Sequence, residues 1–234
     1  MDERAKDMCI KVTADGPYIV TGGVPLVRTE IVCDENGEAL EWREIARIDA
    51  ADRYTLCRCG HSTRKPFCDG SHLDMRFDGT ETAGHDSYAE VAVDIDGPGV
   101  KLRDARRLCA EARFCARGGG LWNLVSECED AEKRELAEQE ATLCPSGRYV
   151  LCDDSGTGER EPDLEASIAL VEDPALGVSG PLWVRGGIPV VDADGVPYEV
   201  RNRVTLCRCG HSGNKPFCDG SHIGAGFADE EASR

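Results

Sequence analysis

The sequence has few aromatic residues, little positive charge and no long apolar run. Aromatic residues make up 6% of the 234 positions, and 27 Lys and Arg stand against 44 Asp and Glu, a formal net charge of -17. Such a negative field repels nucleic acid and anionic membranes, so we expect neither as a partner. No segment approaches the ~20 consecutive apolar residues that cross a bilayer. Residues 1–12 are charged and lack the apolar stretch of a secretion signal, which predicts a cytoplasmic protein.

Sequence signatures of catalysis are missing as well. We find neither a glycine-rich nucleotide-binding fingerprint nor a phosphate-binding loop, and no arrangement of nucleophile and base stands out. We therefore expect a protein that is not an enzyme. The 41% of hydrophobic residues suffice for a buried core, and 26 glycines and 11 prolines predict many loops and turns.

Cysteine, by contrast, is abundant, with 13 residues. Their number is odd and a secretion signal is missing. A disulfide framework is therefore not expected, and metal binding or thiol chemistry is favoured.

An internal repeat organises the chain. Residues 54–72 and 204–222 are identical at 16 of 19 positions, with an offset of 150. Upstream of each copy, residues 16–27 and 180–191 match at 7 of 12 positions, with an offset of 164. The repeat unit is thus predicted to be a β segment, a hairpin and a Cys/His motif. Two copies in one chain suggest a pseudo-twofold arrangement, as if a homodimer had been fused.

Turn residues indicate where the strands of each repeat end. The Asn-Gly pair at 36–37 and the Asp-Gly pair at 194–195 follow valine-rich runs, and both pairs favour tight hairpin turns because they tolerate positive φ. The Gly-Gly pairs at 22–23 and 186–187 are predicted to end or bend a strand.

Each repeat carries the motif C-x-C-x8-C-x3-H. The one-residue gap lets two thiolates converge from one extended turn, and the three-residue gap places Cys68 and His72 on one face of a helical turn that Asp69 is expected to cap. Gly60 and Gly70 are predicted to let the backbone approach a bulky inorganic group. The candidate metal ligands are Cys57, Cys59, Cys68 and His72, then Cys207, Cys209, Cys218 and His222. By spacing alone, each set suits either one tetrahedral zinc ion or a two-iron cluster.

The string CRCGHSxxKPFCDGSH resembles the CDGSH iron–sulfur (NEET-like) family, whose name spells the residues from Cys68 to His72. The resemblance implies two [2Fe-2S] clusters per chain, each held by three Cys and one His. Cys57 and Cys59 would bind the inner iron, and Cys68 and His72 the outer one. It also implies the soluble tandem type, because the transmembrane anchor of the membrane-bound members is missing. A histidine ligand raises the reduction potential and titrates near neutral pH, so we expect proton-coupled electron uptake.

Three functions follow from this ligand set. The first is electron transfer or redox sensing with a redox partner protein. The second is storage of iron–sulfur clusters or their transfer to an apo-acceptor, for which a labile iron–histidine bond is suited. The third is a structural zinc-binding module. In each case we expect a monomer with internal pseudo-twofold symmetry.

Residues 85–165 between the repeats differ in character. Leucine and alanine at helical spacing predict a helix over 100–115, and a segment rich in Ala, Glu and Lys predicts a second helix over 129–143. The acidic stretch 127–140 is expected to be a solvated helix face, with a docking surface for a basic redox partner as the alternative. Residues 152–163 resemble a solvated linker.

Five further cysteines lie in this middle segment. The spacing of Cys109 and Cys115, followed by Cys144 in Cys-Pro-Ser-Gly, resembles the divergent single-cluster 4Fe-4S ferredoxin-like domain, although the usual C-x2-C-x2-C run is missing. The resemblance implies an additional [4Fe-4S] cluster on these three residues, with Cys128, Cys152 or no further residue as a fourth ligand. Alternatively, Cys109 and Cys115 are small apolar residues of a packed helix.

The remaining candidates are expected to be structural. His61 and His211 each follow a Cys-Gly pair, and we expect exposed loop residues there, with a proton-relay role as the alternative. Cys9 and Cys33 are assigned no ligand role.

For the fold, these patterns predict an α+β protein. Two small β-rich CDGSH lobes, residues 1–84 and 166–234, are expected to form an intramolecular pseudo-dimer with a helical insert, residues 85–165, between them. Each lobe is small enough to need its cluster as a staple, so the apo protein should be markedly less stable than the holo protein.

Overall fold

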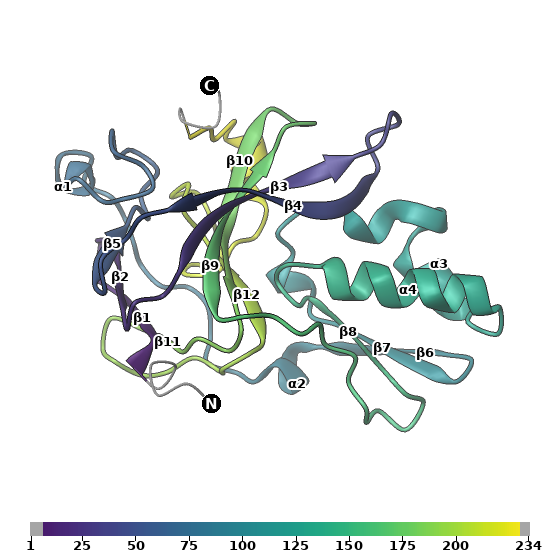
Figure 1. Cartoon of the computed structure of the whole chain (residues 1–234). Coiled ribbons are helices and arrows are strands. Elements are labelled where there is room, and N and C mark those ends of the chain that lie inside the picture. Colours follow the sequence, from purple (N-terminus) through teal and green to yellow (C-terminus); the bar gives the residue numbers. More distant parts are fainter. Residues whose placement is uncertain (1–6, 230–234) are drawn as a thin grey trace.

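The computed structural model describes residues 7–229. The outer ends of the predicted lobes, residues 1–6 and 230–234, lie outside the described residues. The described chain is an α+β protein with three sheets and short helices, as predicted (Figure 1).

The two repeats form matching sets of strands. The first contains β1 (Cys9–Val12), β2 (Tyr18–Thr21), β3 (Leu26–Cys33), β4 (Ala39–Ile48), β5 (Tyr54–Leu56) and α1 (Ser71–Asp74). The second contains β9 (Ser167–Asp173), β10 (Val178–Arg185), β11 (Val190–Val191), β12 (Arg203–Leu206) and α5 (Ser221–Gly224). β2 and β10 end directly before the glycine pairs, as predicted. The predicted β3–β4 hairpin is also confirmed: Asp34 Oδ1 accepts the N–H groups of Asn36 and Glu38 at 2.9 and 2.8 Å.

The repeats exchange strands reciprocally. β3 of the first repeat pairs in parallel with β9 of the second, with Leu26 opposite Ile168. β11 of the second repeat pairs in parallel with β1 of the first, with Val190 opposite Ile10. Because Leu26 and Val190 are equivalent at the offset of 164, the same contact is made twice. Two of the three sheets therefore contain strands of both repeats. Their strand orders are β11-β1-β2-β5 and β12-β10-β9-β3-β4.

The largest hydrophobic core is likewise shared. Val12, Tyr18 and Leu56 of the first repeat are buried in one cluster with Ile168 and Leu206 of the second. The Tyr18 hydroxyl is fully buried and donates to the carbonyl oxygen of Cys207 at 2.7 Å, so its polar group is satisfied across the boundary between the repeats. Neither repeat thus completes a core from its own described strands.

The middle segment has its own sheet, order β6-β7-β8, in addition to helices. Its elements are α2 (Tyr88–Val91), β6 (Val93–Gly97), β7 (Val100–Asp104), η2 (Arg106–Leu108), η3 (Phe114–Gly119), α3 (Leu121–Ser126), α4 (Ala131–Leu143) and β8 (Tyr149–Cys152). In Figure 1, α3 and α4 lie at the right end of the molecule and α1 at the left end, with β9, β10 and β12 between them.

One predicted helix of the middle segment is confirmed and the other is wrong. The helix predicted over 129–143 is α4, whose N-cap Asp130 accepts the N–H groups of Glu132 and Lys133. The segment predicted as a helix over 100–115 begins instead as strand β7. Val100 and Leu102 are buried at the two-residue spacing of a strand, and Gly99, at φ 65°, closes the turn from β6.

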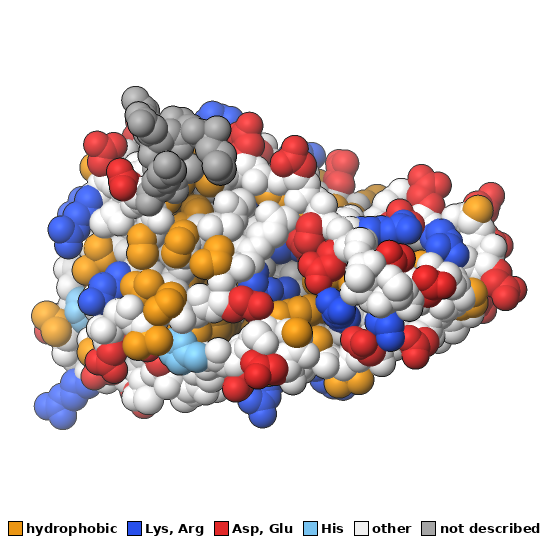
Figure 2. All heavy atoms as spheres, turned by 90° about the horizontal axis from the view of Figure 1, so that it is seen from below, with side chains coloured by type: hydrophobic (Ala, Val, Ile, Leu, Met, Phe, Trp, Pro, Cys, Tyr) orange, Lys and Arg blue, Asp and Glu red, His pale blue; other side chains and the backbone are white. Residues whose placement is uncertain are grey.

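The acidic face of α4 is solvated, with one exception. Glu132 and Glu135 are exposed, as predicted, and Figure 2 shows Asp and Glu side chains spread over one face of the molecule among Lys and Arg. Glu140 instead is fully buried, 3.7 Å from the Nε atom of Arg117, and its burial raises the pKa of the carboxyl to about 7. Within residues 7–229, no helix combines the length and the apolar character that spanning a bilayer requires.

Candidate metal centres

The loop between β5 and α1 holds the first set of candidate ligands as two pairs. The Sγ atoms of Cys57 and Cys59, just after β5, lie 3.8 Å apart. The Sγ atom of Cys68 lies 3.4 Å from Nδ1 of His72, across the start of α1. Ligands of a tetrahedral metal with metal–sulfur bonds of ~2.3 Å lie ~3.8 Å apart, so each pair is spaced as two ligands of one ion.

The loop between β12 and α5 repeats this arrangement. The Sγ atoms of Cys207 and Cys209 lie 3.7 Å apart, and Cys218 Sγ lies 3.5 Å from Nδ1 of His222. Across residues 7–229, His, Cys, Asp and Glu side chains do not gather in threes around a point suited to a single ion. The structure therefore brings the eight predicted ligands together in four pairs.

Identical hydrogen bonds hold both loops. Asp69 is not the N-cap of α1, which is Gly70, but from the position before it Asp69 Oδ1 accepts the Ser71 N–H at 3.0 Å, and Asp69 Oδ2 accepts the Thr63 N–H at 2.8 Å. Asp219 makes the same two bonds, to Ser221 at 3.0 Å and to Gly213 at 2.7 Å. Each loop is thus closed on itself by its own hydrogen bonds.

The two ligand loops also touch each other. A Cβ placed on Gly60 would lie 2.6 Å from the carbonyl oxygen of Cys209, and one on Gly210 would lie 2.6 Å from that of Cys59. That Gly60 admits an inorganic group stays a prediction, and the close approach that the structure shows there is to the backbone of the other repeat. Both glycines have positive φ, 81° and 85°, which adds a second reason for glycine.

The pKa values of the second site's ligands shift in different directions: the hydrogen bond with Cys207 raises the pKa of Cys209 well above its usual range, and burial does the same for Cys218. A hydrogen bond from Cys209 lowers the pKa of Cys207 to about 6, which prepares one thiolate in the pair. Burial and the nearby Arg208 lower the pKa of His222 to about 4, so its imidazole is neutral, as a metal ligand must be. In the first site, Cys59 lowers the pKa of Cys57 in the same way, to about 6.

Exposure distinguishes the two sites. Cys218 and His222 retain 2% and 4% of their surface, whereas Cys68 and His72 are only half-buried. Leu73, beside His72, is 74% exposed. The first site therefore opens to solvent through its Cys68–His72 pair, and the second does not.

Three cysteines of the middle segment line one cavity of about 420 Å³. They are Cys109, Cys115 and Cys144, the three that the ferredoxin-like resemblance implies as ligands. The volume is many times the ~30 Å³ that one water molecule occupies, so the space accommodates a bulky group. Arg148, which also lines the cavity, is held by Asp104 at 2.6 Å and offers positive charge to thiolates.

The two candidates for a fourth cysteine ligand lie elsewhere. Cys128 is buried in the core of the middle segment, where its thiol donates to the carbonyl oxygen of Leu124 at 3.3 Å. Cys152 is buried in β8 beside Tyr88 and Val150. Neither is among the residues described around the cavity. Of the other candidates, His61 and His211 are exposed, and Cys9 and Cys33 are half-buried free thiols.

Sequence reasoning missed the residues that support the loops. The residue between the paired cysteines is arginine in both repeats, and both Arg58 and Arg208 are almost fully buried. Arg58 donates to the carbonyl oxygens of Thr13 and Gly79, and Arg208 pairs with Glu172 and Asp229. Arginine occurs at this position in both copies of the repeat, and this agreement could have indicated its supporting role from the sequence. Glu111, which lines the cysteine cavity and accepts a bond from Cys109 at 3.4 Å, carried no signal of this kind.

Comparison with known protein families agrees with this division of the chain. The family described as "Iron-binding zinc finger CDGSH type" matches residues 15–73 and 179–223, and the family described as "Divergent 4Fe-4S mono-cluster" matches residues 95–154 between them. These matches define an iron–sulfur protein. More particularly, the chain contains two CDGSH iron-binding domains with a divergent 4Fe-4S domain between them. Neither the curated proteins nor the solved structures contain a match to the chain.

Proposed function

We propose that the chain binds two [2Fe-2S] clusters and acts in electron transfer or redox sensing. The observation that carries the proposal is the division of each ligand set into two pairs, because a two-iron cluster takes two protein ligands on each iron. A bound cluster would supply one-electron redox chemistry. Its ligands would be Cys57, Cys59, Cys68 and His72 in the first site, and Cys207, Cys209, Cys218 and His222 in the second.

The histidine ligands give this redox role a proton dependence. An imidazole that binds iron carries no negative charge and accepts a proton more readily than a bound thiolate. We therefore propose that uptake of an electron is coupled to protonation at the histidine ligands, His72 and His222, and more readily at the half-buried His72 than at the buried His222. Replacing both by Cys should largely abolish the pH dependence of the reduction potential, as measured by potentiometric titration at several pH values. A retained pH dependence would show that a group other than these histidines takes up the proton on reduction.

The strand exchange supports the proposal that one chain contains a complete pseudo-dimer. β3 and β11 supply to the opposite repeat what a second subunit would supply in a homodimer. We propose a monomer of this kind that is not an enzyme and works in the cytoplasm with a redox partner protein. The cytoplasmic assignment is supported by thirteen free cysteines, because thiols remain reduced there.

The cysteine cavity supports a further [4Fe-4S] cluster in the middle segment. Cys109, Cys115 and Cys144 would supply three thiolates there, and Arg148 would offset part of the added negative charge. Together with the two [2Fe-2S] clusters, such a centre would bring the total to eight iron atoms per chain.

Cluster transfer to an apo-acceptor is the second candidate function. It is favoured by the exposure of the first site, where an acceptor can reach Cys68 and His72. Incubation of the loaded protein with an apo-ferredoxin, in its oxidised and its reduced state, tests this function. Appearance of the ferredoxin spectrum would support transfer, whereas electron exchange without a change in iron content would support electron transfer.

Metal analysis tests the proposal as a whole. Iron, zinc and acid-labile sulfide are measured per chain on protein purified without oxygen. Four irons and four sulfides are expected for two [2Fe-2S] clusters, and about eight of each if the central cavity is also loaded. Zinc without sulfide after iron-replete expression would overturn the redox function and leave a structural zinc module.

A further inference from the structure

We propose that the middle segment around Glu111 shields the second CDGSH site, so that the first CDGSH site exchanges iron with its surroundings more readily than the second. This inference rests on the proposed function, because it takes both CDGSH sites to be loaded. It assigns Glu111 as a positioning residue and gives the two sites different tasks.

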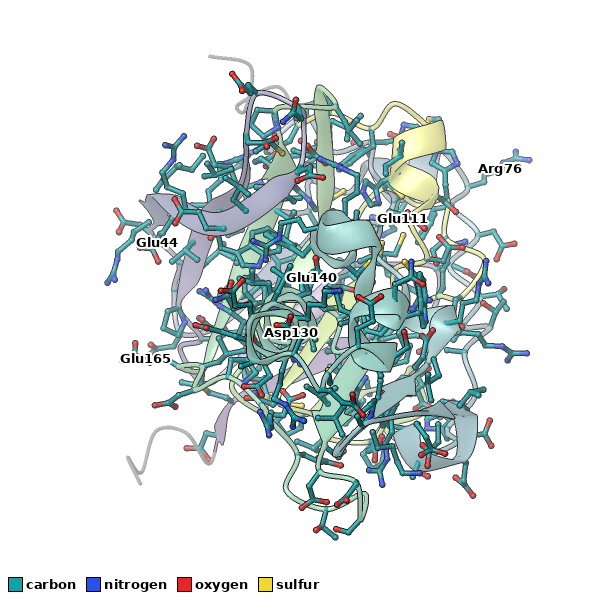
Figure 3. All side chains as sticks on the ribbon, turned by 90° about the vertical axis from the view of Figure 1, so that its right-hand side faces the viewer. Glu44, Arg76, Glu111, Asp130, Glu140 and Glu165 are labelled. Atoms are coloured by element: carbon teal, nitrogen blue, oxygen red, sulfur yellow. The ribbon has the colours of Figure 1, made fainter. Side chains whose placement is uncertain are left out.

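Glu111 lies directly on the second CDGSH turn. A Cβ placed on Gly220 would lie 2.4 Å from Cγ of Glu111 and 3.3 Å from its Cβ. At the equivalent Gly70, no described atom would lie within 4 Å. Figure 3 shows Glu111 beside the C-terminal yellow ribbon, with sulfur atoms close by. The side chain thus covers the turn between Cys218 and His222, a cover that the described residues do not provide for the first site.

The same segment closes over the histidine ligand. A gap of only about 10 Å³ is lined by His222 together with Ala110, Glu111, Ala112 and Pro145. A space of this size is no larger than one water molecule needs. Pro145 directly follows Cys144, so both stretches that carry cavity cysteines face His222.

The second CDGSH site and the central cysteine cavity share a wall. Asp219, which follows the ligand Cys218, lines the 420 Å³ cavity together with Cys109 and Cys115. A group bound in that cavity would therefore lie next to the second CDGSH loop. The first CDGSH loop contributes no residue to the cavity among those described.

Two contacts hold the covering segment in place. Asn214 Nδ2 of the second loop donates to the carbonyl oxygen of Arg107 at 3.1 Å. Arg113 forms an ion pair with Asp173 of β9. Glu111 and Arg113 both have positive φ, 54° and 64°, which is unfavourable for side-chain-bearing residues unless the surroundings enforce it. The segment is therefore fitted to the second repeat rather than loosely placed over it.

Shielding has a direct consequence for iron exchange. A chelator has to reach a ligand or the metal, so a site without an exposed ligand exchanges only when the structure opens locally. At the first site Cys68 and His72 are already half-exposed. We expect the second site to release its iron at least tenfold more slowly.

Iron release from the loaded full-length protein tests the proposal. Fe²⁺ is captured with bathophenanthroline disulfonate in the presence of ascorbate, and release is followed by absorbance. We expect the two CDGSH sites to give a fast and a slow phase of equal amplitude. The variant lacking Cys57 and Cys59 (both to Ser) should retain only the slow phase, and the variant lacking Cys207 and Cys209 only the fast one. Cys115→Ser identifies any iron released from the central cavity.

Glu111→Ala should accelerate the slow phase at least fivefold and leave the fast phase unchanged. Glu129→Ala, an exposed acidic residue of the same segment, is the matched control and should change neither phase. Glu111→Gln should preserve the slow phase, because the shielding is steric. The visible circular dichroism of the second site should change in Glu111→Ala only.

A second pair of variants keeps the test independent of Glu111. Asn214→Ala removes the tether to Arg107 and should accelerate the slow phase, whereas Arg64→Ala, at the equivalent position of the first repeat, should not. Equal release rates from both sites, or a slow phase unaffected by both Glu111→Ala and Asn214→Ala, would overturn the proposal. Fewer than four irons and four sulfides before the chelator is added would instead refute the proposed function.

Discussion

The two CDGSH sites have almost the same sequence and the same internal hydrogen bonds, yet they lie in different surroundings. The first ends in α1, with Leu73 exposed at its side, whereas the second ends in α5 beneath residues of the middle segment. Cys218 and His222 are buried, and Cys68 and His72 are not. The comparison shows that the motif determines which atoms bind the metal, whereas the surrounding segments determine whether solvent, a chelator or an acceptor protein can reach the site.

The buried arginines of the two motifs show the same contrast. Arg58 is held by the neutral carbonyl groups of Thr13 and Gly79. Arg208 is held by the carboxylates of Glu172 and Asp229, and Glu172 also pairs with Arg28 at 2.5 Å. The second site thus rests on a buried network of charges, and the first on backbone hydrogen bonds.

Removal of one metal site at a time should give the largest difference. Loss of the second site (Cys207 and Cys209 both to Ser) should lower the thermal midpoint by about 10 °C more than loss of the first (Cys57 and Cys59 both to Ser). The Cys218–His222 pair of the second site is buried, whereas the Cys68–His72 pair of the first is only half-buried, so that the first loop can open locally more easily. Calorimetry of the iron-loaded variants measures this. Equal midpoints would show that the surroundings of the sites add nothing to stability.

Substitution of the motif arginines should give the next largest effect. Arg208→Met removes one of the two arginines that pair with the buried carboxylates of Glu172 and Asp229, and it should cost about 3–5 kcal/mol of unfolding free energy. Arg58→Met removes one hydrogen bond from each of two carbonyl groups and should cost about 1–3 kcal/mol of unfolding free energy. Urea denaturation of both variants supplies the two values. A greater loss in Arg58→Met would contradict the contrast between the two supports.

The motif glycines provide a sharper pair of variants. Gly70 and Gly220 have nearly the same φ, 94° and 86°, so alanine should cost about 1–2 kcal/mol of backbone strain at either position. In Gly220→Ala, the new methyl group would also clash with the Glu111 side chain, which should cost about 1–3 kcal/mol more of unfolding free energy. The double variant with Glu111→Ala should remove this excess. A persistent excess in the double variant would show that Glu111 is not its cause.

The motif histidines outside the ligand sets should give the smallest effect. His61 and His211 are both exposed, so replacing either by Ala should change the free energy of unfolding by less than about 0.5 kcal/mol. The reduction potentials of the two sites should also be unchanged. A shift of the pH dependence in either variant would support the proton-relay alternative for that histidine.

Local sequence signals predicted the local parts of the structure. The Asp-Glu-Asn-Gly turn, the glycine pairs that end β2 and β10, and the capped helix α4 all depend on a few neighbouring residues. The motif spacing likewise brought each Cys pair and each Cys–His pair within reach. The helix predicted over 100–115 failed because leucine and alanine spacing in a short segment also suits a strand, and the Pro98-Gly99 turn was overlooked.

The contacts between distant segments were beyond the sequence patterns. The cover of His222 by residues 110–112 depends on where the middle segment docks, which no local spacing encodes. Burial of Glu140 in an otherwise solvated helix depends in the same way on the neighbouring η3. The exchange of β3 and β11 was suggested only as an unspecified pseudo-twofold arrangement, because strand pairing over more than 140 residues is decided by tertiary packing.

The exchange of β3 and β11 also determines how the protein would respond to cleavage. A protease cut in the exposed turn around residues 153–158 would break the covalent link between the second repeat and the rest of the chain, but it would not release the fragments from each other. The two fragments would still share the β3–β9 and β1–β11 ladders and one hydrophobic core. They would elute as a single nicked complex, and separately expressed halves would be expected to reassemble by fragment complementation.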